Sequence, residues 1–246
     1  GPDYIDPAWL SLAAGTPCHN LDSFFFDRAE ILRLFEQYVR CTDIAVIEGN
    51  RGLFDGMDSQ GSHSTAELAK LLHAPVILVV DCTKVSRTAA AMVLGCRTMA
   101  PDLNIAGVVL NSVVGSRQEN VIRGAIESVC DIPVLGSIPR IHGLTFSMRH
   151  LGLVPPPEHP DAVAALSQAV DAVQKHLDLD RVRTLASSAP TLRVESPAKA
   201  ARDLRYGGVR IGVVRDAAFN FYYPENIEDL ERRGAEIVEI NALSED

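Results

Sequence analysis

Continuous apolar runs alternate with amphipathic segments along most of the chain. The strand-like runs are unbroken rather than alternating, and they occupy 44–47, 75–81, 105–111 and 132–139. Unbroken runs of this length predict parallel strands that are buried on both faces. Segments with apolar residues at helical spacing lie between and after these runs and predict helices over 27–41, 64–73, 86–100, 117–130 and about 160–177.

The helix starts carry local signals as well. Asp27 is a plausible N-cap for the helix over 27–41, and Ser64 and Glu67 are spaced as a capping box. Alternating strands and helices indicate an α/β fold with a parallel sheet covered on both faces. Such sheets bind ligands beyond the carboxyl ends of their strands. The polar residues at those ends are Glu48, Asp81, Asn111 and Arg140.

The pattern changes after residue 177. Residues 178–207 are rich in charge, Ser and Pro without clear periodicity, and they predict a linker with at most one short helix. A strand over 209–216, a helix over 224–234 and a strand over 235–240 then begin a second α/β domain. Because these elements are too few for a full core, we expect further elements before residue 1 and after residue 246.

Composition narrows the function classes. The chain has 246 residues, 47% of them hydrophobic and 22% charged, with a formal net charge of −9, which is typical of a folded globular protein. The Lys and Arg residues do not cluster, which argues against nucleic acid as a partner. The five cysteines are scattered without metal spacing and indicate reduced thiols in the cytoplasm. The sequence shows no membrane span and no signal peptide, so we expect no membrane partner.

The stretch 43-DIAVIEGNRGLFDG-56 places acids among glycines at a predicted strand end. Glu48 suits Mg²⁺ beside nucleotide phosphates, because Mg²⁺ takes one or two carboxylates and keeps water and phosphate oxygens. Glycines at 49, 52 and 56 would let the backbone approach a ligand closely. A tight turn with a solvated acid is an equally good interpretation of Glu48 alone, and Asp55 tips the balance towards a site.

Other candidates have structural alternatives. The segment 3-DYIDP-7 offers two carboxylates in an extended, Pro-terminated stretch, for a metal or a polar substrate or as a surface turn. Asn111 could bind a base edge or cap a turn. Arg87 could hold an anionic group of the substrate or lie on the surface. The seven histidines show no metal spacing, and no cysteine has an obvious neighbouring base.

Several phrases in order resemble the cobyrinic acid a,c-diamide synthase family. They cover almost the whole chain except the linker: GPDYIDP at 1–7, NLD at 20–22, IEGNRGLFDG at 47–56, TAELAKLLHAPVILVVD at 65–81, IAGVVLN at 105–111, PVLGSIPR at 133–140, RHLGLVPPPE at 149–158 and DAAFNFYYPENIEDLERRGAE at 216–236. The resemblance implies a P-loop NTPase-like (dethiobiotin synthetase-like) domain over 1–180 that lacks its N-terminal P-loop unit. A linker over 181–208 and the start of a class I glutaminase-like domain over 209–246 would follow.

The resemblance also implies a ligase reaction of cobalamin biosynthesis. ATP would phosphorylate an acetate carboxylate of a tetrapyrrole in the presence of Mg²⁺, and ammonia from glutamine would displace the phosphate. Residues 1–246 alone would be inactive, and a homodimer is an open expectation. The implied site has Asp3 and Glu48 near the metal and phosphates, Asp6 and Asp55 among the catalytic groups, Tyr4 beside the substrate, and Asn111 and Arg140 near the adenine.

Departures from the family leave the substrate open. They fall at Trp9-Leu10, 15-GTPC-18 and Asn50-Arg51, near the expected substrate side, and they favour sirohaem or sirohydrochlorin as an alternative tetrapyrrole. A nucleotide-binding switch ATPase and a dethiobiotin synthetase-like carboxylase are alternatives of other classes. Neither would need the 219-FNFYYPEN-226 tail.

Overall fold

The computed structural model describes residues 3–40, 42, 44–141, 148–149, 152–192 and 208–244. The chain divides into two compact units. One contains Gly1–Asp22, Thr145–Leu166 and Glu195–Asp246, and the other contains Ser23–Leu144 and Ser167–Val194. We refer to them as the first and the second unit.

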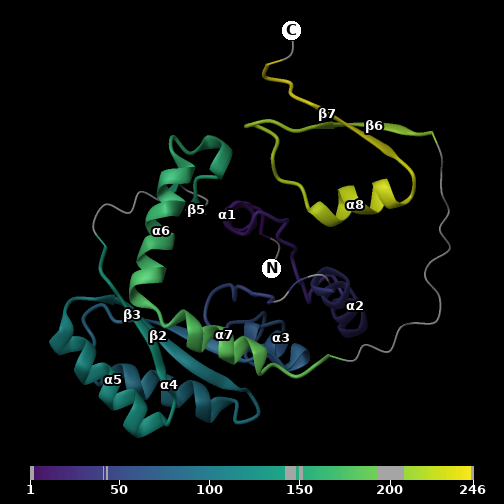
Figure 1. Ribbon diagram of the computed structural model, residues 1–246. Helices are drawn as coiled ribbons and strands as arrows, with labels where there is room; N and C mark the ends of the chain where they lie inside the picture. Colours follow the sequence, from purple (N-terminus) through teal and green to yellow (C-terminus); the bar gives the residue numbers. More distant parts are fainter. Residues whose placement is uncertain are drawn as a thin grey trace. The chain divides into compact units, whose positions relative to one another are not determined.

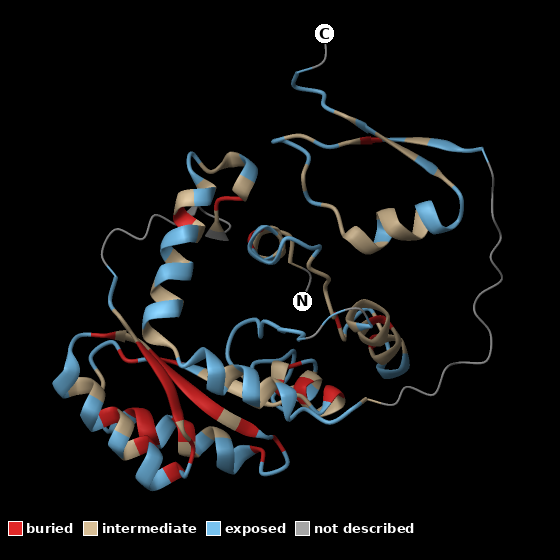
Figure 2. Ribbon diagram, in the orientation of Figure 1, coloured by how far each residue is buried: buried red, intermediate tan, exposed pale blue. Residues whose placement is uncertain are grey.

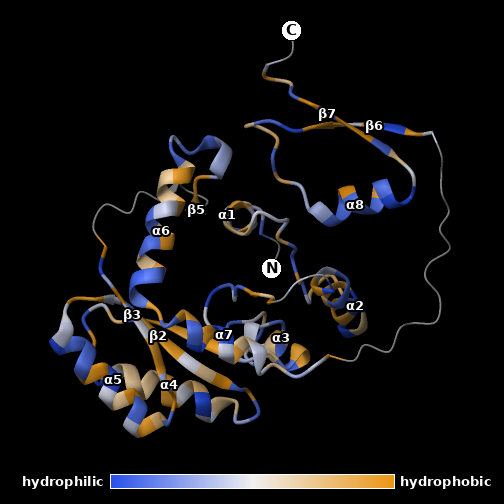
Figure 3. Ribbon diagram, viewed as in Figure 1, coloured by the Kyte–Doolittle hydropathy of each residue, from blue (hydrophilic) through white to orange (hydrophobic). Residues whose placement is uncertain are grey.

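The second unit contains the predicted parallel sheet. Its strands are β1 (Val76–Asp81), β2 (Ile105–Val113) and β3 (Val134–Pro139), in the order β1-β2-β3 with parallel pairing throughout (Figure 1). The central strand β2 is the most buried part of the unit, as Figure 2 shows, and its residues Val108 and Leu110 have no exposed area. The same strand is strongly hydrophobic in Figure 3, as a strand covered on both faces requires. Three of the four predicted strands and the α/β class with a parallel sheet are thereby confirmed.

Four predicted helices of this unit are also present. They are α2 (Arg28–Val39), α3 (Thr65–Leu72), α4 (Thr88–Met99) and α5 (Ser116–Cys130). The Asp27 side chain accepts the N–H of Glu30 at 2.9 Å, and the Ser64 side chain accepts the N–H of Glu67 at 3.4 Å, so both predicted N-caps form. Helices α4 and α5 lie side by side and contribute Val93, Ile122 and Ile126 to the core shared with β2 (Figure 1).

The fourth predicted strand, over 44–47, is not formed. Residues 44–50 have no regular secondary structure, and the side chain of Val46 is 90% exposed. An apolar run becomes a strand only where a neighbouring strand pairs with its backbone, because β-propensity reflects packing and pairing context. Within the described residues β1 pairs with β2 alone, so Ile44–Ile47 gains neither ladder hydrogen bonds nor a buried face.

Helices α6 (Ala162–His176) and α7 (Leu179–Ser187) follow the sheet in sequence. Helix α7 begins against β3, where the N–H of Asp178 donates to the C=O of Leu135 at 2.8 Å. A Cβ on Gly136 would meet the backbone of Leu177, so this close approach requires glycine. The short helix allowed within the predicted linker is therefore present, whereas residues 193–207 of the linker lie outside the described residues.

The first unit begins with helix α1 (Ile5–Ala14), which the sequence did not predict. The segment 3–7 is not extended, because Asp6 and Pro7 lie in the first turn of this helix. Proline is tolerated there, since the first turn has no preceding carbonyl for its missing N–H. Gly15 ends the helix in the left-handed region with φ of 66°. Trp9 is 6% exposed, and its Nε1 donates to the C=O of Val154 at 3.0 Å.

The other elements of the first unit follow the prediction closely. Strands β6 (Arg210–Val214) and β7 (Glu236–Ile240) pair in parallel, with α8 (Pro224–Arg232) connecting them. Two short strands, β4 (Met148–Arg149) and β5 (Gly152–Leu153), and the 3-10 turn η1 (Pro156–Glu158) belong to this unit as well. Over the whole described part of the chain, the helices are too short or too polar to cross a membrane.

Candidate functional site

A glycine-lined loop of the second unit carries Glu48 and Asp55. The Oδ2 atom of Asp55 accepts the N–H of Gly52 at 3.1 Å, and the N–H of Asp55 donates to the C=O of Gly52 at 3.1 Å. A Cβ on Gly52 would lie 2.6 Å from Oδ2 of Asp55. The carboxylate therefore sits directly on the glycine, which explains the spacing of these two residues.

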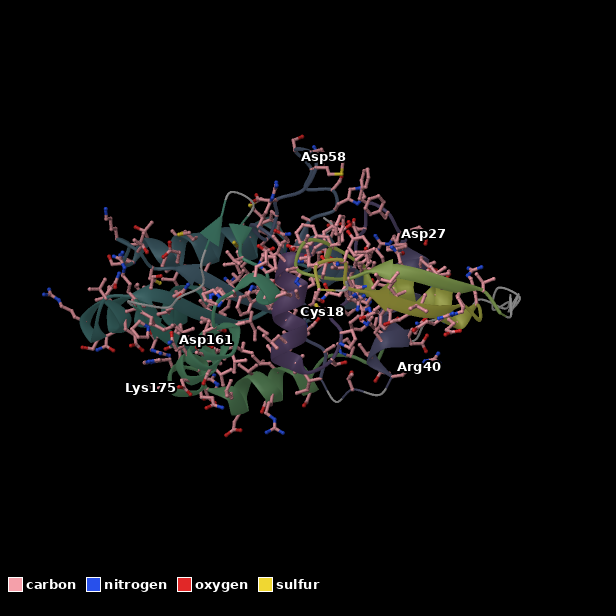
Figure 4. All side chains as sticks on the ribbon, turned by 90° about the horizontal axis from the view of Figure 1, so that it is seen from above. Cys18, Asp27, Arg40, Asp58, Asp161 and Lys175 are labelled. Atoms are coloured by element: carbon pink, nitrogen blue, oxygen red, sulfur yellow. The ribbon has the colours of Figure 1, made fainter. Side chains whose placement is uncertain are left out.

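This loop is attached to the hydrophobic core of the second unit through its residues Leu53 and Phe54. Leu53 and Phe54 pack against the hydrophobic core, and the C=O of Leu53 accepts the N–H of Ala66 at 2.9 Å. The side chains of Glu48 and Asp55 are exposed. A rigidly held loop with solvent-facing carboxylates can accept a hard cation that keeps most of its water and phosphate ligands. The later part of the loop is set by Asp58 (labelled in Figure 4), whose Oδ1 accepts the N–H groups of Gln60 and Ser62.

The carboxyl edge of the sheet brings three predicted residues together. Asp81 and Asn111 are direct partners in the β1–β2 register, and the N–H of Arg140 donates to the C=O of Val113 at 3.0 Å. Hydrogen bonds from the side chain and backbone of Thr83 lower the pKa of Asp81. Glu48 differs from the prediction, because it precedes the glycine loop without ending a strand.

The two predicted arginines, Arg87 and Arg140, are exposed, whereas the Asn111 side chain makes a local hydrogen bond. Arg87 is exposed immediately before α4, and Arg140 is exposed after β3. The Oδ1 atom of Asn111 accepts the N–H of Ser112 at 2.9 Å, within an irregular part of β2 where Ser112 has φ of 60°. Asn111 therefore makes a local backbone contact inside β2 instead of capping a turn, and its binding to a base edge stays a prediction.

The acids of the first unit form a pair at the start of α1. The Oδ1 atom of Asp3 accepts the N–H groups of Ile5 at 3.0 Å and Asp6 at 3.2 Å. Burial, together with the charge and hydrogen bonding of Asp3, raises the pKa of Asp6. Two carboxyl groups this close favour a shared proton or a nearby cation.

Tyr4 packs into an aromatic group of the same unit. Its ring stacks on Phe221, with centroids 5.3 Å apart, and on Tyr223, with centroids 4.6 Å apart. Burial and a side-chain hydrogen bond with Tyr4 raise the pKa of Tyr223. The role of Tyr4 towards a substrate stays a prediction.

A cavity of about 400 Å³ lies beside these residues within the first unit. Its walls include Asp3, Ser11 and Cys18 from the N-terminal segment, and Arg215 and Asp216 from the turn after β6 (Cys18 is labelled in Figure 4). Arg215 pairs with Glu239 at 2.8 Å and lies over the Tyr222 ring, and Asp216 accepts the N–H groups of Ala218 and Phe219. The cavity can hold a ligand with both polar and apolar groups.

Several residues of this region were missed by sequence reasoning. Asn20 contacts both Asp3 and Glu225 by hydrogen bonds, and His19 lies 3.3 Å from Glu225. The NLD phrase at 20–22 was the available signal, but nothing in its spacing indicates a partner 205 residues away.

The described residues limit the metal and thiol chemistry of the chain. Within the described ranges, His, Cys, Asp and Glu side chains do not gather in groups of three or more that could hold a metal ion. A Mg²⁺ ion that takes one or two carboxylates and fills its sphere with water and phosphate needs no such group, so the exposed carboxylate of Glu48 fits it, whereas the other predicted ligand, Asp3, belongs to the first unit. Burial raises the pKa of Cys82, Cys96 and Cys130, which disfavours the thiolate form.

Comparison with known proteins gives one family and a consistent set of relatives. The model of the family described as "AAA domain" matches residues 22–147. The chain is 46% identical to the cobyrinate a,c-diamide synthase of Magnetococcus marinus and 40% identical to those of Methanobrevibacter smithii and Archaeoglobus fulgidus. Each match covers 100% of this chain and 53–54% of the relative, so the chain spans about half the length of these proteins. A search of solved structures finds no match.

Proposed function

The chain belongs to the AAA-domain family, which matches residues 22–147, and from this premise we propose that its protein amidates the a and c acetate carboxylates of cobyrinic acid or a close tetrapyrrole. The observation that carries the proposal is the similarity to cobyrinate a,c-diamide synthases over 100% of the chain. The resemblance in the sequence phrases is thereby confirmed. ATP and glutamine are the proposed co-substrates in cobalamin biosynthesis.

The proposed reaction has two steps. A carboxylate oxygen attacks the γ-phosphorus of ATP, so that ADP leaves and an acyl phosphate forms. Ammonia released from glutamine then attacks the acyl carbon and phosphate leaves, which gives the amide. Because carboxylate and triphosphate repel each other, catalysis depends mainly on positioning and charge neutralisation. Mg²⁺, when bound, would supply part of that neutralisation.

The acids of the chain have separate proposed roles. From the family resemblance we assign metal and phosphate binding to Glu48 of the second unit and to Asp3 of the first unit, and the ordering of substrate and intermediate to Asp55 and Asp6. The exposed carboxylates on an anchored loop support this assignment for Glu48 and Asp55. The hydrogen bond from the backbone N–H of Asp6 to Asp3 supports a joint role for these two acids.

Binding groups complete the proposed site. Tyr4 and Arg87 would contact the tetrapyrrole, whereas Asn111 and Arg140 would lie near the adenine. The joint position of Asn111 and Arg140 at the carboxyl edge of the sheet supports a nucleotide there.

The domain assignment is also part of the proposal. We propose a synthetase domain over 1–180, a linker over 181–208 and a glutaminase-type domain that begins at 209. The parallel β6–α8–β7 unit supports the last assignment, because it starts an α/β domain. Free cysteines at Cys18, Cys82, Cys96 and Cys130 support a reducing compartment, the cytoplasm.

Sirohaem or sirohydrochlorin is the second candidate substrate. Only some of the sequence departures that favour it lie where they could contact a substrate. Trp9 is a core residue with a satisfied Nε1, so its departure from the family reflects packing. Asn50 and Arg51 are exposed on the glycine loop, and Cys18 lines the cavity of the first unit. These two departures, at Asn50-Arg51 and at Cys18, are available to contact a different tetrapyrrole.

The test offers cobyrinic acid, sirohaem and sirohydrochlorin in parallel to the full-length protein with Mg-ATP and glutamine. Mass spectrometry follows the conversion of acid to amide. Diamide from cobyrinic acid is the expected result, and amide from the sirohaem series alone would reassign the substrate. ATP turnover without any amide would favour a switch ATPase.

Two variants test the site itself. Glu48→Gln and Asp55→Asn should each lower the amidation rate by roughly 100-fold or more, because Glu48→Gln removes a proposed Mg²⁺ ligand and Asp55→Asn removes a proposed catalytic carboxylate. The unfolding transition should not change. Glu36→Gln is the matched control, since Glu36 forms a surface ion pair with Arg40. Full activity in either site variant would remove that residue from the site.

A further inference from the structure

Asn20 contacts the acid pair and helix α8 at the same time. Its Oδ1 accepts the N–H of Asp3 at 3.3 Å, and its Nδ2 donates to the C=O of Asp3 at 3.0 Å. Its own backbone N–H donates to Oε1 of Glu225 at 3.0 Å. One side-chain amide therefore satisfies both polar backbone groups of Asp3, and this requires a donor and an acceptor in one plane.

We propose that Asn20 is a positioning residue, which fixes the Asp3–Asp6 carboxyl pair for the amidation reaction and couples it to helix α8. This inference rests on the proposed function. Asn20 is the first residue of the NLD stretch at 20–22, and its proposed role is to hold Asp3 and Asp6 in place without taking part in the chemistry itself.

The position of the Asp3 backbone determines where both carboxyl groups lie. The Asp3 side chain accepts the N–H groups of Ile5 and Asp6, and so it fixes the first turn of α1. Asn20 holds the backbone of Asp3 from the other side. Loss of the Asn20 amide would leave the Asp3 backbone free to rotate, and both carboxyl groups would move with it. Small misplacements of reacting groups cost orders of magnitude in rate.

Glu225 is the residue of α8 to which the backbone of Asn20 is bound. It lies in the first turn of α8, where the helix dipole favours a negative charge. Its Oε1 is 3.3 Å from Nδ1 of His19, whose Nε2 is 3.8 Å from Glu228. Burial raises the pKa of Glu225, but hydrogen bonds from His19 and from backbone N–H groups outweigh it, so the net pKa is lowered. An ionised acceptor makes the bond to Asn20 a strong one.

Aromatic packing also attaches residues 3–6 to the segment that precedes α8. Tyr4, next to Asp3, stacks on Phe221 and Tyr223, which immediately precede α8. The hydroxyl of Tyr222 donates to the C=O of Val214 at 2.7 Å and ties this turn to β6. Residues 3–6 are thus attached by both polar and apolar contacts to a segment more than 200 positions away. A shift of α8 would be transmitted directly to the acids.

The experiment compares Asn20→Ala, Asn20→Asp and Glu225→Gln in the full-length protein. Asn20→Asp keeps an acceptor for Asp3 but loses the donor. Asn226→Ala and Glu231→Gln are the controls, because both residues are exposed in α8. The readouts are kcat and KM of amidation for ATP and the hydrogen exchange of the backbone amides of residues 3–14.

For Asn20→Ala we expect kcat to fall roughly 10- to 100-fold with KM for ATP changed by less than about threefold. The amides of Asp3, Ile5 and Asp6 should exchange at least about tenfold faster. Asn20→Asp and Glu225→Gln should show intermediate effects at the same amides, and the double variant Asn20→Ala with Glu225→Gln should be no worse than Asn20→Ala. The controls should match the wild type.

Two results would overturn the positioning role. One is unchanged kcat in Asn20→Ala despite faster exchange. The other is faster exchange throughout the first unit with a parallel loss of activity and of thermal midpoint, which would make Asn20 a general stabilising residue. If the wild type amidates no tetrapyrrole, the proposed function fails and the role of Asn20 in that reaction fails with it. The exchange data would then show separately whether Asn20 clamps Asp3.

Discussion

The absence of a side chain at Gly52 leaves the space that the Asp55 carboxylate occupies. Gly52 supports Asp55 so closely that an added Cβ would lie 2.6 Å from its Oδ2 atom. Gly124 in α5, by contrast, is exposed and has open space around the same position. The two residues therefore offer a direct comparison between a glycine required by a contact and one that is not.

We predict that Gly52→Ala displaces the Asp55 carboxylate and lowers the amidation rate at least about tenfold, because a positioned charge is lost. Gly124→Ala should leave activity unchanged and raise the free energy of unfolding by about 0.5–1 kcal/mol, since alanine is the better helix former. Steady-state kinetics and urea unfolding measure the two effects. Wild-type activity in Gly52→Ala would show that the loop adapts and that the close contact is not needed.

The lowered pKa of Glu225 predicts that the stability of the fold depends on pH. Its folded-state pKa is lowered from 4.5, so its ionised form stabilises the fold above that value. This stabilisation is lost as the pH falls through the folded-state pKa. Between about pH 6 and pH 3, Glu225→Gln should therefore lose less stability than the wild type, as measured by thermal unfolding of the protein in a pH series. Glu231→Gln, exposed in the same helix, should follow the wild type; a wild-type pH profile in Glu225→Gln would mean that Glu225 contributes nothing.

Helices and strands were predictable where a local signal and a buried partner coincided. The helix over 27–41 has both an N-cap and an apolar face with Ile31 and Leu34 buried, and it formed as predicted. The run 44–47 has the apolar residues without a paired neighbour, and it remained irregular. Local composition cannot reveal whether a strand edge is available, so this error has a physical cause.

Candidate site residues show the same division. The contact between Gly52 and Asp55 is local; the sequence predicted that Gly52 admits a close approach, but of a ligand and not of the Asp55 carboxylate. Asp81 and Asn111 meet because parallel strands end at one edge, which the pattern also predicted. The contact of Asn20 with Glu225 depends on tertiary structure alone, so no window of sequence contains it.

The cap of α2 gives a prediction at the element scale. Asp27 (labelled in Figure 4) accepts the N–H of Glu30, and Asp27→Ala leaves that donor without its protein partner. We expect a loss of about 1 kcal/mol in the free energy of unfolding, measured in urea. Asp27→Asn should cost much less, because asparagine caps as well as aspartate does. Asp171→Ala, on the exposed surface of α6, should be neutral or slightly stabilising; an equal loss there would contradict the capping explanation.

At the scale of the molecule, each compact unit has its own source of stability. The second unit has a core of aliphatic side chains from β2, α4 and α5, in which Ile126 has no exposed area. The first unit has fewer buried aliphatic residues and relies on the Tyr4 stack and the contacts of Asn20 with Asp3 and Glu225. Stability is then unequal along the chain, and segments far apart in sequence gain or lose it together.

This difference predicts that substitutions in the two units affect different sets of amides. Ile126→Ala should cost roughly 2–5 kcal/mol, because it leaves a cavity in a packed core, and should increase exchange in β1, β2 and β3. Tyr4→Ala should increase exchange in α1, β6 and α8 together while the three sheet strands stay protected. Hydrogen exchange followed by mass spectrometry measures both variants in the full-length protein. A uniform increase over all these elements in Tyr4→Ala would show that the chain opens as one cooperative body, and the coupling of the acid pair to α8 would then be no stronger than its coupling to the sheet.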